Sequence, residues 1–267
     1  MKSKDLAKTV REDVVRMAFL SKGSHVGSAL SIVDILAVLY SDIINVNKNN
    51  YEEVNRDRFI LSKGHAGSAL YATLARLGFF DSSLLDYHYA NGSKLSGHVS
   101  HKGLPGIEVS TGSLGHGISM ATGFALNAKL SCQDYRVYVI IGDGECDEGS
   151  VWEACAFAVH HKLDNLTVIV DNNKIQAMGK CDDVMKMSPY EEKFKSFGLD
   201  VISVDGHNHE ELKAAFLKKT SGAPKCIVAN TIKGYGVSFM ENNLTWHYRN
   251  PSEEDYNNAL IEIRGEK

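Results

Sequence analysis

Residues 136–179 constrain the fold of this chain more than any other stretch. Residues 137–141 are apolar and rich in β-formers, as expected of a buried strand. A helix is predicted at about residues 150–163, and a second short apolar run follows at 166–170. Strand, helix and strand in this order are typical of a βαβ unit with two parallel strands. In open α/β sheets, ligands bind at the carboxyl ends of such strands.

Polar side chains gather where these two strands end. The first strand is followed by four carboxylates, Asp143, Glu145, Asp147 and Glu148, and the second by Asn172 and Asn173. The loop is not a dinucleotide fingerprint, because Asp147 stands where a third glycine is needed, and it lacks the Gly-Lys-Ser/Thr of a P-loop. Four carboxylates would repel a bare phosphate, but a divalent cation between them removes the conflict. Asp143 and Asn173 are therefore predicted oxygen ligands for Mg²⁺ or Ca²⁺.

Composition narrows the class of protein. A chain of 267 residues with 43% hydrophobic content fits one large α/β domain, which we place at residues 1–267. With a net charge of −4, the chain has no overall positive potential that would attract nucleic acid. The five cysteines are odd in number and include no C-x-x-C, which indicates free thiols and a cytoplasmic protein. The N-terminus lacks a signal-peptide core, and no run approaches 18 consecutive apolar residues, so no membrane association is expected.

The rest of the chain alternates helices and strands. Helical spacing or capping signals predict helices at about 5–20, 31–44, from after 68 to 77, 82–89, 118–130, 190–197, 210–219 and from 252, with Asn208 and Ser252 as N-caps. Further strands are predicted at 58–62, 201–204 and 225–231. This alternation predicts an α/β fold with an open, mostly parallel sheet and helices on both faces.

Several histidines lie in turns or loops. His25 stands between glycines in a turn, where a histidine is more often solvated than catalytic. His65 lies at a strand-to-helix junction, well placed to meet an anion but equally consistent with a helix cap. His98 and His101 lie in a long glycine-rich loop without nearby cysteines, which disfavours a zinc site. A loop this long in a compact domain is usually functional.

The two strand ends together carry a specific resemblance. Gly142-Asp143-Gly144 and Asn172-Asn173 are separated by 27 residues, 145 through 171, which resembles the thiamine-diphosphate motif. The resemblance implies a metal, Mg²⁺ with Ca²⁺ or Mn²⁺ as alternatives, bound by Asp143, Asn173 and the backbone carbonyl of Ile175. It also places Gly142, Gly144 and Glu145 against the cofactor.

Almost the whole chain resembles the N-terminal, diphosphate-binding domain of transketolase. The matching segments are SHVGSALS, DRFILSKGHAGSALYA, SGHVS, GIEVSTGSLGHGIS and KGYGVSFMENN with a following Trp-His. The resemblance implies that His25, His65 and His98 line the thiazolium and the substrate channel, and His247 lies near the diphosphate. It places Gly112, Ser113 and Leu114 at the aminopyrimidine ring, and Glu148 on a link between two active sites.

Two segments depart from the family pattern. The family usually has Gly-His-Pro-Gly or Gly-His-Ile-Gly where this chain has Ser24-His25-Val26-Gly27, and His-Gly where this chain has His247-Tyr248. Both segments face the implied substrate channel, so we expect them to affect sugar specificity.

The resemblance also implies a partner. Full transketolases continue with a pyrimidine-binding domain, whose glutamate activates the cofactor ring, and with a third domain. The chain is therefore expected to be the N-terminal subunit of a split, α₂β₂ transketolase that moves a two-carbon ketol unit from a ketose or its phosphate to an aldose. Leu114 and Ile118 are expected to be partly exposed at the interface. The alternatives are an α subunit of a 1-deoxyxylulose-5-phosphate synthase-like or 2-oxo-acid dehydrogenase enzyme, or a non-catalytic metal/diphosphate-binding regulatory subunit.

Overall fold

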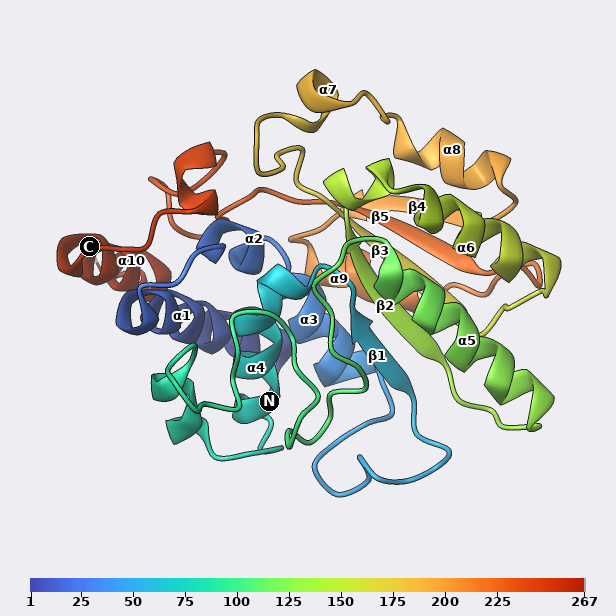
Figure 1. Cartoon of the computed structure of the whole chain (residues 1–267), viewed down its shortest axis with the longest axis horizontal. Helices are drawn as coiled ribbons and strands as arrows, with labels where there is room; N and C mark the ends of the chain where they lie inside the picture. The colour runs from blue at the N-terminus through green and yellow to red at the C-terminus, as the bar shows by residue number, and fades with distance from the viewer. Residues whose placement is uncertain (267) are drawn as a thin grey trace.

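Five parallel strands form the sheet on which the molecule is built, in the order β1–β2–β3–β5–β4 (Figure 1). The computed structural model describes residues 1–266. The strands are β1 Arg58–Leu61, β2 Val137–Gly142, β3 Leu166–Asn172, β4 Asp200–Asp205 and β5 Lys225–Asn230. The predicted α/β fold with a parallel sheet is confirmed, and each predicted strand is present with its end moved by no more than two residues.

Helices cover both faces of this sheet (Figure 1). The first layer contains α1 Ser3–Ser21, α2 Val26–Leu30, α3 Val33–Val38, α4 Gly67–Arg76 and α9 His209–Leu217, with α10 Glu253–Arg264 packed on α1. The second layer contains α5 His116–Leu130, α6 Gly149–His160 and α8 Tyr190–Ser196, while the short α7 Cys181–Val184 lies at the periphery.

Successive residues along a strand pack alternately into two hydrophobic cores, one on each face of the sheet. Along β2, Tyr138 and Ile140 pack with the first layer, whereas Val139 and Ile141 pack with the second. Every residue of β2 and β3 is buried, because both faces of a parallel sheet are covered. Gly142 pairs with Asp171 in the sheet register, so the loops that follow β2 and β3 leave the sheet at the same level.

The helix predicted at residues 31–44 was wrong in its bounds. The chain is already helical at Val26, and the helix is interrupted at Ser31. It resumes at Val33 and ends in a π-helical turn, Leu39–Ile43. The break has a physical cause, because the buried Ser31 hydroxyl hydrogen-bonds the Asp171 carboxylate (2.7 Å) and the Ser28 carbonyl (3.0 Å). The stretch Val26–Ile43 has the length and hydropathy of a membrane span, but 83% of it is buried inside this fold.

Most other helix boundaries differ from the prediction by a residue or two, and α6 ends three residues earlier than predicted. Helix α5 begins two residues earlier than predicted, because Gly115 takes a left-handed conformation (φ 75°) that turns the chain into the helix. The segment 82–89 is a 3₁₀ helix at Ser82–Tyr87, and the acidic loop after β2 contains a 3₁₀ turn, Gly144–Asp147. Both predicted N-caps are confirmed: Asn208 accepts from two backbone N–H groups, and Ser252 forms a capping box with Asp255.

Candidate active site

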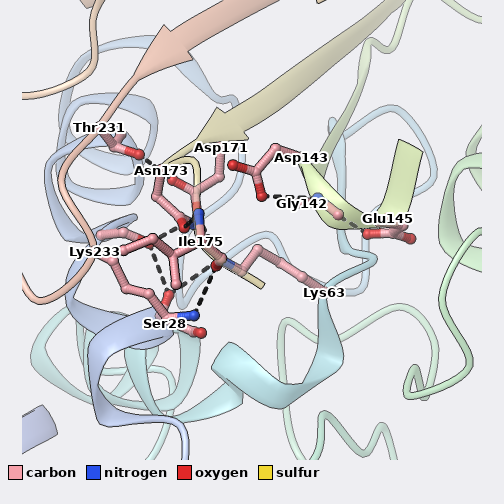
Figure 2. Close-up of polar contacts among 12 residues, drawn as sticks. Ser28, Lys63, Gly142, Asp143, Glu145, Asp171, Asn173, Ile175, Thr231 and Lys233 are labelled. Carbon is pink, nitrogen blue, oxygen red and sulfur yellow. Dashed lines mark hydrogen bonds and ion pairs between the residues drawn. The ribbon is translucent and has the colours of Figure 1, made fainter. Parts of the chain in front are cut away.

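One cavity of about 260 Å³ lies at the carboxyl edge of the sheet. Its walls are the segments that follow β1, β2, β3 and β5, together with the turn that carries His25 and the loop before α5. Figure 2 shows the polar part of this region, with side chains from the different strand ends directed toward one another. All the site residues predicted from the sequence line the cavity except Ser113 and Glu148.

Asp143 follows β2 and is only 2% exposed. One of its carboxylate oxygens accepts a hydrogen bond from the Gly144 N–H at 2.8 Å, and the other accepts from the Lys174 N–H. Burial, and next the negative charge of Asp171, raise the pKa of Asp143 to about 6. A buried carboxylate with a raised pKa is an unfavourable anion that a bound cation would stabilise.

Asn173 and Ile175 bring further oxygen atoms to the same cavity (Figure 2). The Asn173 amide nitrogen donates to Asp171 at 2.7 Å, which fixes the orientation of the amide, and its oxygen accepts from the Ile175 N–H at 3.1 Å. The Ile175 carbonyl accepts from the Lys233 ammonium at 2.8 Å. Carboxylate, amide and carbonyl oxygens are the ligand types that Mg²⁺ and Ca²⁺ prefer, so these residues fit a divalent cation.

Glu145 lies in the cavity wall with its carboxylate already engaged. It accepts hydrogen bonds from the Ser62 hydroxyl, from the Gly115 N–H at 2.7 Å and from the Gly142 N–H at 3.1 Å. Burial raises the pKa of Glu145, and these hydrogen bonds oppose the shift. The side chain therefore ties the end of β1 and the start of α5 to the loop after β2.

Four histidines form the opposite part of the cavity wall. The His25 ring is central, with ring centroids 5.2 Å from His65, 5.8 Å from His98 and 5.0 Å from His247. Burial is the largest cause that lowers the pKa of His25 to about 4 and of His247 to about 3, and it holds the pKa of His65 well below its usual value. These three imidazoles are therefore neutral at pH 7, each with one N–H donor and one acceptor nitrogen.

The backbone at His25 is held in an unusual conformation. Its φ of 72° lies in the left-handed region, which costs a non-glycine residue free energy. The His25 N–H donates to the His247 carbonyl at 2.7 Å, and the Ser24 hydroxyl contacts the His25 Nδ1 at 2.8 Å. These contacts join the turn before α2 to the C-terminal segment and fix the ring at the centre of the cluster.

Ser113 and Glu148 lie outside the cavity and are exposed. Glu148 precedes α6, and its side chain lies beside Gly115, where an added Cβ would come within 2.9 Å of the Glu148 Cβ. Their assigned roles, contact with the aminopyrimidine and a link between active sites, stay predictions. The expectation that Ile118 is partly exposed was wrong, because it is fully buried in the core under α5, whereas Leu114 is partly exposed as expected.

Two buried lysines line the cavity and were not predicted. Lys63, 1% exposed, follows β1 and forms an ion pair with Asp171, while its ammonium also donates to the Ser28 carbonyl at 3.2 Å. Lys233, also 1% exposed, follows β5 and contacts the His247 Nδ1 at 2.9 Å. Burial, and next the charge of Lys63, lower the pKa of Lys233 to about 8. The one feature of the sequence that could have marked these lysines as site residues is that each follows a predicted strand, at the edge of the sheet where ligands bind.

Asp171 organises this part of the site. Its carboxylate is fully buried and accepts from Lys63, Ser31, Thr231 and Asn173. Burial alone would raise the pKa of Asp171, but the Lys63 charge and these hydrogen bonds hold it below its usual value. One carboxylate thus connects the ends of β1, β3 and β5.

Comparison with known families and proteins identifies this arrangement. The family described as "Transketolase, thiamine diphosphate binding domain" matches residues 2–261. A protein named as one of the subunits of apulose-4-phosphate transketolase, from Phocaeicola vulgatus, is 40% identical over 255 residues, which cover 95% of this chain and 90% of the relative. The protein named 6-deoxy-6-sulfo-D-fructose transketolase subunit SqwG from a Clostridium species is 42% identical and covers 91% of this chain and 89% of the relative.

Longer transketolases match over part of their length. Human transketolase is 38% identical over 91% of this chain, but the match covers 39% of the human protein. The transketolase structure from Leishmania mexicana superimposes with a TM-score of 0.93 at 31% identity, over 99% of this chain and 41% of that protein. The chain thus spans about two fifths of these longer relatives. It belongs to the transketolase family and corresponds to the thiamine diphosphate-binding domain of that family.

Proposed function

We propose that this chain is the N-terminal, cofactor-binding subunit of a two-subunit transketolase. Such an enzyme moves a two-carbon ketol unit from a ketose, or a ketose phosphate, to an aldose. The proposal rests on one observation: oxygen atoms that can bind a metal ion and neutral imidazoles line the same cavity at the carboxyl edge of the sheet. The subunit names of relatives matched over about nine tenths of their own length support it.

The inner part of the cavity would hold the metal and the diphosphate. Asp143, Asn173 and the Ile175 carbonyl would bind Mg²⁺, with Ca²⁺ or Mn²⁺ as alternatives. Lys233 adds positive charge to the same cavity, which favours an anionic ligand there, whereas the charge of Lys63 is offset by Asp171. When bound, thiamine diphosphate supplies the carbanion chemistry that cleaves and forms the bonds to the two-carbon unit.

The histidine part of the cavity would face the reacting sugar. Because His25, His65 and His247 are neutral at pH 7, each can donate a hydrogen bond to a substrate oxygen or accept a proton from a hydroxyl. His98 is exposed at the outer side of the cluster, where a substrate would first meet it. Gly112 and Leu114 would lie against the aminopyrimidine ring.

A second polypeptide would complete the site. We infer that it carries a pyrimidine-binding domain with the glutamate that activates the cofactor ring, and that two copies of each chain assemble as α₂β₂. The exposed Glu148 would then lie at the contact between active sites. We place this assembly in the cytoplasm, in keeping with five cysteines that form no disulfide.

The experiment is ketol transfer measured with the chain alone, the partner alone and both together, with Mg²⁺ and thiamine diphosphate present. Activity is expected only in the mixture, because neither chain contains a complete site. Cofactor and partner should also tighten each other's binding by the same factor. Robust transfer by the single chain would contradict the two-subunit proposal. A mixture that binds cofactor yet transfers nothing from any ketose would favour a regulatory subunit, and activity confined to a 2-oxo acid would favour another enzyme class.

A further inference from the structure

Tyr248 lies beside the histidine cluster that forms part of the cavity wall. Its ring centroid lies 4.7 Å from that of His247 and 6.0 Å from that of His25, and both histidines line the cavity. The side chain is nevertheless 65% exposed. The tyrosine ring thus meets two imidazoles of the cavity wall at steep angles, 65° and 59° between ring planes, while most of its surface stays in solvent.

The segment that carries Tyr248 is well anchored. Trp246 is 3% exposed, and its indole N–H donates to the Phe239 carbonyl at 3.0 Å. On the other side, Arg249 pairs with Asp255 at 2.9 Å and lies 4.8 Å from the Trp246 ring centre. The Tyr248 N–H donates to the Thr245 carbonyl at 3.3 Å. Single exposed aromatics are common on protein surfaces, but this one is fixed against two imidazoles of the site.

The size and polarity of the cavity leave the sugar chain outside it. The volume of about 260 Å³ is shared by the oxygen donors and lysines at one end and the imidazoles at the other. If the diphosphate and metal occupy the inner end, as the proposed function requires, the reacting carbons lie at the imidazoles. The remaining carbons of a long sugar must then extend outward from the imidazoles, two of which the Tyr248 ring contacts.

We propose that Tyr248 is a specificity-determining residue whose ring contacts the carbon chain of the sugar beyond its reacting carbons. An aromatic face packs well against the C–H side of a polyhydroxylated chain, while the hydroxyl groups of the chain keep their contacts with water. The inference rests on the proposed function and adds to it a residue that discriminates acceptors by chain length: acceptors of about five carbons gain from the ring, and a two-carbon acceptor is too short to reach it.

The test uses the assembled two-chain enzyme with one ketose donor and two acceptors, glycolaldehyde and a five-carbon aldose. Tyr248→Ala should raise KM for the five-carbon aldose about three- to tenfold with little change in kcat, and leave glycolaldehyde within about twofold. Tyr248→Phe keeps the ring and should behave as wild type. The matched control is Tyr87→Ala, because Tyr87 is 63% exposed and lines a different hollow beside Leu84.

Comparing two acceptors in the same variant makes the result independent of how much protein folds or assembles. The inference is overturned if Tyr248→Ala affects both acceptors equally, if it leaves both unchanged, or if it improves the longer acceptor. It is also overturned if Tyr248→Phe is as impaired as Tyr248→Ala. A change in the Kd for the cofactor in either Tyr248 variant, relative to wild type, would likewise overturn it. In each case transfer to glycolaldehyde by the wild type still supports the proposed function. Wild-type enzyme inactive with every acceptor would overturn both.

Discussion

The buried lysines are the residues that the sequence alone left unassigned. Lysine is rarely buried without a partner, and nothing local marks Lys63 or Lys233 as different from surface lysines. Their environment is created by the fold, which brings the ends of β1, β3 and β5 together around Asp171. A buried ion pair of this kind is costly to break, since one charge is then left without its partner.

Lys63→Met tests that conclusion. It should lower the free energy of unfolding by about 3–5 kcal/mol, because Asp171 stays buried without its counter-charge. The control is Lys129→Met, which removes an ion pair with Asp164 whose two side chains are 37% and 46% exposed and should cost less than about 1 kcal/mol. Urea unfolding of both variants measures the difference. Equal effects would show that the Lys63 pair contributes no more than a surface pair.

At the scale of elements, the start of α5 is fitted tightly to the end of β1. A Cβ at Gly117 would approach the Ser62 side chain and Cα to 2.5–2.7 Å. The Ser62 hydroxyl in turn bonds Glu145, which also holds the Gly115 N–H. The glycines before and within α5 therefore set the distance between this helix and the cavity wall.

Gly117→Ala should destabilise the protein by about 1–3 kcal/mol, because the added methyl group meets atoms that cannot move freely. Gly123 is the matched position in the same helix, with nothing within 4 Å of an added Cβ. Gly123→Ala should raise the free energy of unfolding by about 0.5–1 kcal/mol through helix propensity. Denaturant midpoints compare the two variants. Stabilisation by both would mean that the contact with Ser62 is not restrictive.

The sequence predicted the elements well where periodicity and capping signals were strong. The run at 137–141 and the Asn208 and Ser252 caps were readable because they depend on neighbouring residues. The break at Ser31 was not, because its cause is a hydrogen bond to Asp171, 140 positions away. The motif likewise located Asp143 and Asn173, but the engagement of Glu145 and the burial of Ile118 depend on packing between elements.

At the scale of the whole molecule, the sheet gathers the site at one edge and leaves it open on one side. The strand ends supply oxygen donors and cations, whereas the turn before α2 and the C-terminal segment supply imidazoles. Two core layers, one on each face of the sheet, hold these segments in place. In the proposed two-subunit enzyme, this chain would hold one half of the cofactor and leave the other half to the partner.

The metal-dependent binding of thiamine diphosphate tests this account most directly, by calorimetry on the chain with and without Mg²⁺. The control variant is Asp147→Asn, since Asp147 lies on the same loop and its carboxylate accepts from Gln176 at 3.1 Å. Asp143→Ala removes the acceptor of the Gly144 and Lys174 N–H groups, so Tm is measured for each variant to separate a loss of binding from a loss of fold. The account predicts at least about 100-fold weaker Mg²⁺-dependent binding for Asp143→Ala and wild-type binding for Asp147→Asn. Unchanged Mg²⁺-dependent binding by Asp143→Ala would contradict it.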